Sequence, residues 1–247
     1  MPASPDGSAD ASSSDHTATG GLRVLAIDIG GTNVKILLEG EKVPRKFPSG
    51  PKLTPKLMVE GVKKLAGDWK FGRVSIGYPG AIRDGRPIAE PAHLAKGWRK
   101  FDFAAAFGCP VRIINDAAMQ ALGSYDGGKM LFLGLGTGLG SAMVVEGQLL
   151  PMELGHLPVR KRIYEYYVGV DALKRYGKRK WLAHVKRTVD ALSAALLPDY
   201  VVLGGGNVKQ MKKLPKGCRA GANENAFVGG FRLWDDAHSR HEAASNS

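Results

Sequence analysis

The chain contains twice the pattern of an apolar run, a glycine turn and a second apolar run. It occurs first at residues 23–40, RVLAIDIGGTNVKILLEG, and returns at residues 130–147, MLFLGLGTGLGSAMVVEG. A short apolar run that ends at glycine is typical of a buried strand followed by a tight turn. This weak internal repeat therefore predicts two similar lobes, each containing a strand–turn–strand unit.

Helical patterns alternate with the predicted strands along the chain. Residues 54–67 begin with Thr54 as an N-cap and Pro55 at the first helical position, and residues 181–197 carry an apolar stripe at helical spacing. Alternating helices and strands predict an α/β architecture.

We expect the chain to divide near Asp116 into a lobe of residues 21–116 and a lobe of residues 117–236, with the chemistry in the cleft between them. Residues 1–20 and 237–247 contain few large apolar side chains. Such segments bury too little apolar surface to offset the entropy lost on ordering, so both are predicted to be disordered tails.

The chain is basic, with 35 Lys and Arg against 23 Asp and Glu and a formal net charge of +12. This excess favours polyanionic ligands such as nucleic acid, nucleotides or phosphate polymers, although a solvated basic surface explains it equally well. The charge is concentrated at residues 173–181, LKRYGKRKW, at Lys186 and Arg187, and at residues 209–217, KQMKKLPKG.

Cysteine content and hydropathy exclude several other classes of protein. Cys109 and Cys218 are the only cysteines and lie far apart, so neither a disulfide framework nor a thiolate zinc site is predicted. The first residues lack the pattern of a secretory signal, and no apolar run reaches the roughly 18 residues that a membrane span needs. We therefore expect a cytoplasmic protein without a membrane partner.

Three glycine-rich turns follow predicted strands, namely DIGGT at residues 28–32, GLGTGLG at residues 134–140 and GGGN at residues 204–207. Glycine permits positive φ and lets backbone N–H groups approach an anion closely, as in phosphate-binding turns. An ordinary tight hairpin is the alternative for any single turn. None has the Gly-Lys-Ser/Thr of a Walker sequence.

Two acidic residues, Asp28 and Asp116, stand where predicted strands end beside these turns. Carboxylates in such places suit a magnesium–phosphate assembly and a general base. A helix N-cap is the alternative role for Asp116.

Five segments together resemble the ROK family of sugar kinases, within the actin, sugar kinase and Hsp70 ATPase superfamily. They are AIDIGGTNVK, GYPG, IINDAAMQALG, GLGTGLGSAMVVEGQLLPMELGH and VVLGGG, and their order and spacing match from about residue 22 to residue 234. The run that leads from the second glycine turn to MELGH is most similar to the polyphosphate-dependent glucokinase branch. The resemblance implies a two-lobed actin-like ATPase (ribonuclease H-like) fold with a cleft between the lobes.

The resemblance also implies an activity. The family pattern transfers a phosphoryl group from polyphosphate, ATP or both to the 6-hydroxyl of glucose or a related hexose, with Mg²⁺ as cofactor and Asp116 as general base. The same pattern gives hexose contacts to Asn115, Glu153, His156, Glu165 and Gly80. It gives phosphate or nucleotide contacts to Asp28, Gly30, Gly31, Thr32, Lys35, Gly136, Thr137, Gly138, Gly204, Gly205 and Gly206, with Asp28 also binding magnesium, directly or through water.

The spacing of Glu153 and His156 matches half of a helical metal site. However, Pro151, Gly155 and Pro158 disfavour a regular helix, and no second such pair completes a site. We therefore predict a loop that presents both side chains to sugar hydroxyls.

The sequence departs from the family in two places. The family's CxCGxxGCxE motif is absent after Gly155 and His156, so no zinc is expected. Glu165 lies in the segment that resembles the end of that motif, and a charged residue on a surface helix is its alternative reading. His93 stands where the family often has Asn, which leaves the sugar open.

Several functional alternatives therefore remain. The acceptor could be fructose, mannose or an aminosugar, and the basic segments could form a track for polyphosphate or a solvated face. A sugar-responsive DNA-binding regulator is the second class, and a catalytically silent sugar-binding protein is the third. Such regulators carry a helix-turn-helix before the kinase-like part, which residues 1–20 do not resemble, so nucleic acid is not the expected partner. Relatives in the family commonly form homodimers, and we expect the same here.

Overall fold

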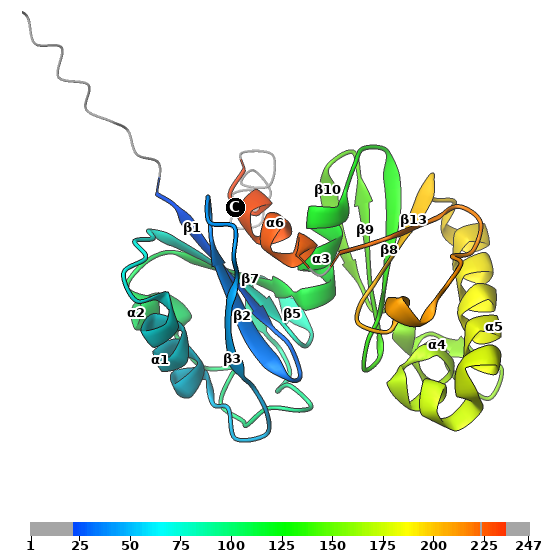
Figure 1. Cartoon of the computed structure of the whole chain (residues 1–247), viewed down its shortest axis with the longest axis horizontal. Coiled ribbons are helices and arrows are strands. Elements are labelled where there is room, and N and C mark those ends of the chain that lie inside the picture. Colours follow the sequence, from blue (N-terminus) through cyan, green and yellow to red (C-terminus); the bar gives the residue numbers. More distant parts are fainter. Residues whose placement is uncertain (1–21, 223, 236–247) are drawn as a thin grey trace, which may run out of the picture.

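The computed structural model describes residues 22–222 and 224–235. Two five-stranded sheets stand side by side, with helices α3 (Asp116–Ser124) and α6 (Asn225–Arg232) between them (Figure 1). Helices and strands alternate along the chain, which confirms the predicted α/β architecture. The predicted tails, residues 1–20 and 237–247, lie outside the described residues.

The first sheet has the strand order β3-β2-β1-β4-β7, in which β1, β4 and β7 are parallel and β2 and β3 are antiparallel neighbours. All six positions of β1 are buried. Helices α1 and α2 pack on one face of this sheet and complete its apolar core. The bounds are β1 Val24–Ile29, β2 Asn33–Leu38, β3 Arg45–Pro48, β4 Arg73–Tyr78, β7 Val111–Asn115, α1 Pro55–Ala66 and α2 Phe103–Phe107, with a small hairpin of β5 Ile82–Arg83 and β6 Arg86–Pro87.

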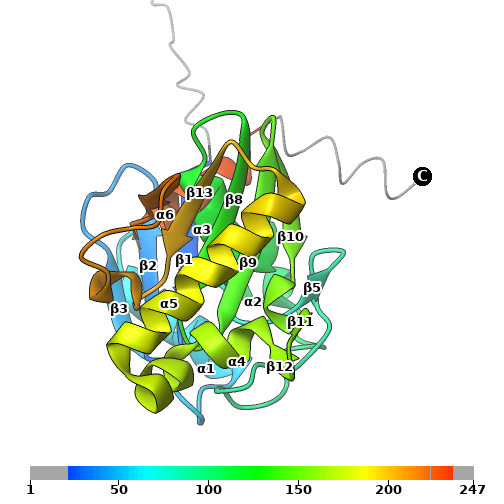
Figure 2. The ribbon, with the colours of Figure 1, turned by 90° about the vertical axis from the view of Figure 1, so that its right-hand side faces the viewer.

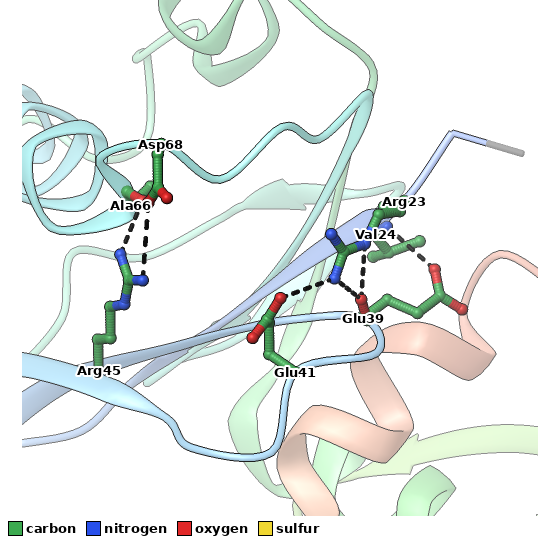
Figure 3. A network of polar contacts seen from close by, with 7 residues as sticks. All are labelled: Arg23, Val24, Glu39, Glu41, Arg45, Ala66 and Asp68. Atoms are coloured by element: carbon green, nitrogen blue, oxygen red, sulfur yellow. Dashed lines mark hydrogen bonds and ion pairs between the residues drawn. The ribbon is translucent and has the colours of Figure 1, made fainter. Parts of the chain in front are cut away.

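The ends of α1 show why the sequence forms a helix here. The Thr54 hydroxyl accepts a hydrogen bond from the Leu57 N–H at 3.2 Å, and Pro55 occupies the first turn, as predicted. At the other end, the Arg45 guanidinium donates to the Leu65 carbonyl at 2.9 Å and to the Ala66 carbonyl at 2.8 Å. Figure 3 shows the contact with Ala66. This arginine comes from β3, so it caps the helix and also ties it to the edge of the sheet.

The second sheet repeats the theme of the first, with the order β10-β9-β8-β13-β14. Its central hairpin of β8 and β9 corresponds to the β1–β2 hairpin, which confirms the strand–turn–strand repeat. Helices α4 and α5 pack on one face (Figure 2). The bounds are β8 Lys129–Leu135, β9 Leu139–Val145, β10 Gln148–Met152, β13 Tyr200–Gly204, β14 Cys218–Ala220, α4 Tyr164–Val168 and α5 Val170–Leu196, with 3-10 turns η1 Leu154–His156 and η2 Val208–Gln210 and a hairpin of β11 Pro158–Val159 and β12 Arg162–Ile163.

Helix α5 is longer than the predicted segment 181–197 and is kinked. Gly177 has φ 71° and ψ 162°, which is not helical, so two helical segments meet at this residue. The second segment buries Trp181, Val185, Val189 and Leu192, which are spaced as the apolar stripe predicts. Within the described residues, no helix has both the length and the apolar composition that a membrane crossing requires.

Helix α6 follows the second sheet in the chain but packs against β1 and β4 of the first sheet and against α3. The Ser75 hydroxyl on β4 donates to the Gly230 carbonyl at 2.6 Å and accepts from the Trp234 indole N–H at 2.8 Å. The chain therefore returns to the first sheet at its end. The division near Asp116 remains a proposal. Helix α6 belongs to the predicted lobe of residues 117–236, but it packs against the first sheet, which lies in the predicted lobe of residues 21–116.

Candidate active site

A cavity of about 520 Å³ lies between the two sheets and is lined from both sides. We call it the intersheet cavity. Residues from the ends of β1, β4 and β7 meet residues from the β8–β9 turn, η1 and α4 there. The predicted site residues among its lining are Gly31, Gly80, Asn115, Asp116, Gly136, Thr137, Gly138, Glu153, His156, Glu165 and Gly205.

Asp116 begins α3, directly after β7 delivers the chain to the cavity. Its Oδ1 accepts a hydrogen bond from the Ala117 N–H at 2.8 Å. Burial is the main cause that raises the pKa of Asp116 to about 7, and the charges of Asp28 and Glu153 act in the same direction. A carboxylate with a pKa near neutrality can take up a proton in one step and lose it again in the next.

Asp28 lies on β1 and is buried, and its cross-strand neighbour on β2 is Lys35. The Lys35 Nζ stands 3.4 Å from the Asp28 Oδ2. Burial raises the pKa of Asp28, while the charge and the hydrogen bond of Lys35 oppose this rise. Asp28 is buried and Asp116 is half-buried, and the charge of Asp28 raises the proton affinity of Asp116, so this pair of carboxylates is a natural place for a cation.

Asn115 is the N-cap of α3, so its side chain is largely engaged within the protein. Its Oδ1 accepts from the N–H groups of Ala117 and Ala118 at 2.9 and 3.2 Å, and its Nδ2 donates to the Gly80 carbonyl at 3.1 Å. An amide NH₂ has two hydrogens, so one N–H remains for a ligand. The capping role that was the alternative for Asp116 thus belongs to Asn115.

Glu153 directly precedes the 3-10 turn η1 and His156 ends it, and this turn follows β10. Their side chains are exposed, with 3.9 Å between Glu153 Oε2 and His156 Nδ1. The prediction that this segment does not form a regular α-helix is confirmed. Both residues line the intersheet cavity, where they can reach a ligand.

Glu165 does not lie on an open surface helix. Its Oε2 accepts from the Leu139 N–H at 3.3 Å, and a Cβ on Gly138 would come within 2.0 Å of the same oxygen. Glycine at position 138 is therefore required so that α4 can place a carboxylate against the β8–β9 turn.

Most glycines of the three turns do not have the positive φ that the sequence analysis expects of them. Among the predicted phosphate-binding glycines, Gly205 has a positive φ, 83°, and the others do not. Those glycines serve close packing or border open space instead. A Cβ on Gly204 would meet the Phe132 ring at 2.4 Å, whereas a Cβ added to Gly31, Gly136 or Gly206 would have no atom within 4 Å.

The two turns of the second sheet are linked to each other and to α5. The Asn207 side-chain amide donates to the Gly136 carbonyl at 3.0 Å, and the Val170 N–H at the start of α5 donates to the carbonyls of Gly136 and Thr137. The turns therefore form one rigid rim of the intersheet cavity.

Some predicted phosphate-binding residues do not line the intersheet cavity. Gly30, Thr32, Gly204 and Gly206 each adjoin Gly31 or Gly205, which line the cavity. Asp28 and Lys35 are not among the lining residues, and neither are their chain neighbours. Asp28 nevertheless acts on Asp116 through its charge, which raises the pKa of Asp116.

Two polar side chains of the lining, Gln120 and Glu90, have no counterpart in the sequence prediction. Gln120 lies four residues after Asp116 on α3 and reaches the same cavity, a position that the helical i, i+4 spacing could have indicated. Glu90 accepts from the N–H groups of Gly97 and Trp98 at 3.0 Å each, which holds the loop that carries His93. His93 itself lines the cavity, where a change of side chain can affect the choice of acceptor.

A neighbouring cavity of about 440 Å³ shares Ala81, Asn115 and Glu153 with the intersheet cavity. Its other walls come mainly from β7, β10 and the β5–β6 hairpin. Neither Asp116 nor a glycine turn lines it, whereas Asp116 and residues of the glycine turns line the intersheet cavity, so the candidate chemistry belongs to the intersheet cavity.

Comparison with known proteins gives the family to which these features correspond. The model of the ROK family matches residues 24–164, which is more than half of the chain. The polyphosphate glucokinase of Mycobacterium leprae (strain TN) is 29% identical over 209 residues, which cover 74% of this chain and 63% of the relative. This chain thus spans less than two thirds of that relative's length.

Solved structures show the same fold. An inorganic polyphosphate/ATP-glucomannokinase from Arthrobacter sp. strain KM superimposes with a TM-score of 0.73 at 24% identity, covering 91% of this chain and all of that one. A ROK family transcriptional regulator, a homologue of the E. coli MLC protein, superimposes with a TM-score of 0.69 at 15% identity, over 85% of this chain and 77% of that one. The predicted two-lobed actin-like fold is confirmed.

Proposed function

Because this chain belongs to the ROK family, we propose that it is a hexokinase. It transfers a phosphoryl group from polyphosphate, ATP or both to the 6-hydroxyl of glucose or a related hexose. The observation that carries the proposal is the Asp116 carboxyl, whose raised pKa places it near neutrality inside a cavity bordered by two glycine turns. The names of the polyphosphate glucokinase and glucomannokinase relatives support the choice of donor and acceptor.

In this mechanism Asp116 accepts the proton of the acceptor hydroxyl as that oxygen attacks the terminal phosphorus of the donor. The bond between this phosphorus and the bridging oxygen of the donor breaks, and ADP or the shortened polyphosphate leaves with its electron pair. Phosphoryl transfer demands mainly positioning and charge neutralisation, with one group to orient the nucleophile. Glu153, His156, Glu165 and the free N–H of Asn115 hold the remaining hydroxyls of the sugar. A sugar of the wrong stereochemistry would cover at least one of these groups without offering it a hydroxyl partner, and this mismatch provides discrimination.

Magnesium is the cofactor that this reaction class implies, and the donor set fits it. Asp28 supplies hard carboxylate oxygens within electrostatic reach of the general base Asp116, and burial raises the pKa of both carboxyls. Within residues 22–222 and 224–235, no three His, Cys, Asp or Glu side chains converge to form a complete metal site. Donor phosphate oxygens and water would therefore complete the coordination, and the bound cation would neutralise charge on the transferred group.

The β8–β9 turn and the turn after β13 are the proposed donor side. Thr137 and the surrounding glycines line the cavity there, and α5 begins at the same turn. Exposed cationic side chains continue outward from this rim on two segments. They are Lys174, Arg175, Lys178 and Arg179 on α5 and Lys209, Lys212 and Lys213 after β13. We propose that they attract a polyphosphate chain.

Raising the salt concentration is therefore expected to weaken the use of long polyphosphate more than the use of ATP. If about three phosphates contact these cations, KM for long polyphosphate rises about tenfold between about 50 and 200 mM salt. Initial rates with polyphosphate of defined length and with ATP, at saturating hexose, measure this difference. A KM for polyphosphate that does not change with ionic strength would rule out an electrostatic track.

The direct test of the proposed function is a two-way panel. Purified protein with magnesium is offered ATP or polyphosphate, each against glucose, mannose, fructose and aminosugars, and the phosphorylated sugar is measured. We expect product with glucose or mannose. Sugar binding without product from any pair would favour a silent sugar-binding protein. Sequence-specific retention of duplex DNA would favour a regulator, the role named for one structural relative.

A further inference from the structure

A separate cavity lies on the outer side of α4, and we call it the outer cavity. It has a volume of about 190 Å³ and shares no lining residue with the intersheet cavity. Its walls come from the β11–β12 hairpin, α4 and the second half of α5 (Figure 2). The lining residues are Val159, Arg160, Tyr164, Tyr167, His184, Arg187, Thr188 and Ala191.

The charge of the outer cavity is positive. Burial lowers the pKa of His184 most, and the charges of Arg187 on α5 and Arg160 in the hairpin lower it further, so both guanidinium charges act at the imidazole. Among the residues that the structure describes, neither arginine forms an ion pair with a carboxylate. Asp190, the acid that follows on α5, pairs with Lys186 at 2.6 Å. Arg160 and Arg187 thus both line the outer cavity without a carboxylate partner among the described residues.

One wall of the outer cavity is aromatic. The His184 ring stands 5.3 Å from the ring of Tyr167 and 5.1 Å from the ring of Tyr176, measured between centroids. Thr188, which is buried, also lines the cavity and carries a hydroxyl group. A small molecule can therefore place an anionic group at the arginines and an apolar or sugar-like face against the rings.

The conformation of Arg160 provides an independent observation. Its φ is 55°, in the left-handed region that costs a residue with a Cβ roughly 1 kcal/mol or more. Glycine would adopt this turn without that cost. Arginine at this position supplies a cation to the cavity that glycine could not.

We propose that the outer cavity binds the phosphate group of a small molecule, either inorganic phosphate or a phosphate monoester, between the guanidinium groups of Arg160 and Arg187. Guanidinium groups match the oxygens of phosphate with paired hydrogen bonds, and two of them neutralise its charge. The size of the cavity suits a phosphate or a compact monoester better than a long polymer.

The site lies one helix away from the proposed chemistry. Helix α4 turns Tyr164 and Tyr167 toward the outer cavity and Glu165 toward the intersheet cavity, where Glu165 accepts from the Leu139 N–H. A ligand that joins the hairpin, α4 and α5 therefore restricts the helix that positions Glu165. This regulatory consequence rests on the proposed kinase function, whereas the binding of phosphate does not.

Binding is tested on the full chain by following the imidazole proton resonances of its histidines during titration with phosphate. His184→Gln identifies the relevant resonance, and neither magnesium nor donor is present, so the result is independent of kinase activity. Inorganic phosphate and glucose 6-phosphate are titrated separately at constant ionic strength. We expect a saturable shift of the His184 resonance. A shift with both ligands assigns the site to the phosphate group alone, and a shift only with the ester assigns it to monoesters.

Arg187→Gln and Arg160→Gly should each weaken this binding by about tenfold or more, because a charge-assisted contact is lost. Arg160→Gly also relieves the left-handed backbone, so its loss of binding cannot be attributed to a disrupted hairpin. Arg86→Gln is the control, since it removes one exposed arginine that lines none of the cavities and lies outside the proposed donor track. No His184 shift in the unmodified protein, or equal binding by all three variants, would overturn the proposal.

The regulatory consequence has its own readout. Phosphate at a fixed ionic strength should change the KM for hexose in the unmodified protein and in Arg86→Gln, but not in Arg187→Gln. A KM that phosphate leaves unchanged despite binding at His184 would overturn the coupling to Glu165. Absence of any sugar phosphorylation would instead contradict the proposed function and leave the binding result standing.

Discussion

Asp116→Asn is expected to lower kcat by about 10²- to 10⁴-fold while hexose binding persists. Asparagine keeps the shape of the side chain and can still accept from the Ala117 N–H, but it cannot take a proton from the acceptor hydroxyl. Initial rates and direct hexose binding separate the two effects. Asp126→Asn is the control, since Asp126 forms an exposed pair with Arg219 at 3.2 Å. Near-normal kcat in Asp116→Asn would exclude this residue as the general base.

The same substitution should stabilise the folded protein at high pH. The pKa of Asp116 is raised from 3.8 to about 7 in the folded state, so ionising it above pH 7 opposes folding. The corresponding free energy is at most about 4 kcal/mol, and less because the side chain opens to a cavity that water can enter.

Thermal unfolding without magnesium or donor measures this effect. The unmodified protein should lose stability relative to Asp116→Asn as pH rises from about 4 to 8, and the two should converge at the acidic end, where the carboxyl is protonated in both states. A difference that stays constant with pH would show that Asp116 is not held in an environment that disfavours its charge.

Gly229→Ala is expected to lower the free energy of unfolding by about 2–3 kcal/mol. A Cβ at this position would lie 1.8 Å from the Met119 carbonyl oxygen, which belongs to the backbone of α3. A backbone atom cannot rotate away as a side chain can, so α3 and α6 must separate. Alanine gains up to about 1 kcal/mol over glycine in a helix, which is too little to offset this clash.

Chemical denaturation of a graded series tests the crossing of α3 and α6. Gly206→Ala should change stability by less than about 0.5 kcal/mol, because no atom lies within 4 Å of the added methyl. Gly230→Ala should fall between the two, since its Cβ would meet a side-chain atom, the Ala26 Cβ, at 2.8 Å. Equal stability of the Gly206 and Gly229 variants would contradict a close helix crossing. Because α3 begins at Asp116, we also expect Gly229→Ala to reduce kcat.

Features that depend on neighbours in the sequence were predictable. The N-cap at Thr54, the two strand–turn–strand units and the non-helical character of the segment around Glu153 follow from side-chain spacing, prolines and glycines within a few residues. The grouping of Asp116, Glu153 and Glu165 around one cavity followed from the family resemblance rather than from any local pattern.

The roles of individual glycines were only partly predictable. Glycine was expected for its positive φ, yet Gly138 is needed so that Glu165 can reach the β8–β9 turn, and Gly204 leaves room for Phe132. These contacts join residues far apart in the chain, and one sequence does not reveal which side chain will occupy the space that a glycine leaves open.

The α/β alternation, the repeated hairpins and the family could be predicted from the chain alone, because hydrophobic period, capping and turn chemistry act over a few residues and leave local patterns. Three features became visible only in the folded protein: α6 returns to the first sheet, Asn115 rather than Asp116 caps α3, and Arg160 and Arg187 line one cavity. Each of these depends on contacts between distant segments, and those contacts are set by how the helices and sheets pack rather than by the residues on either side.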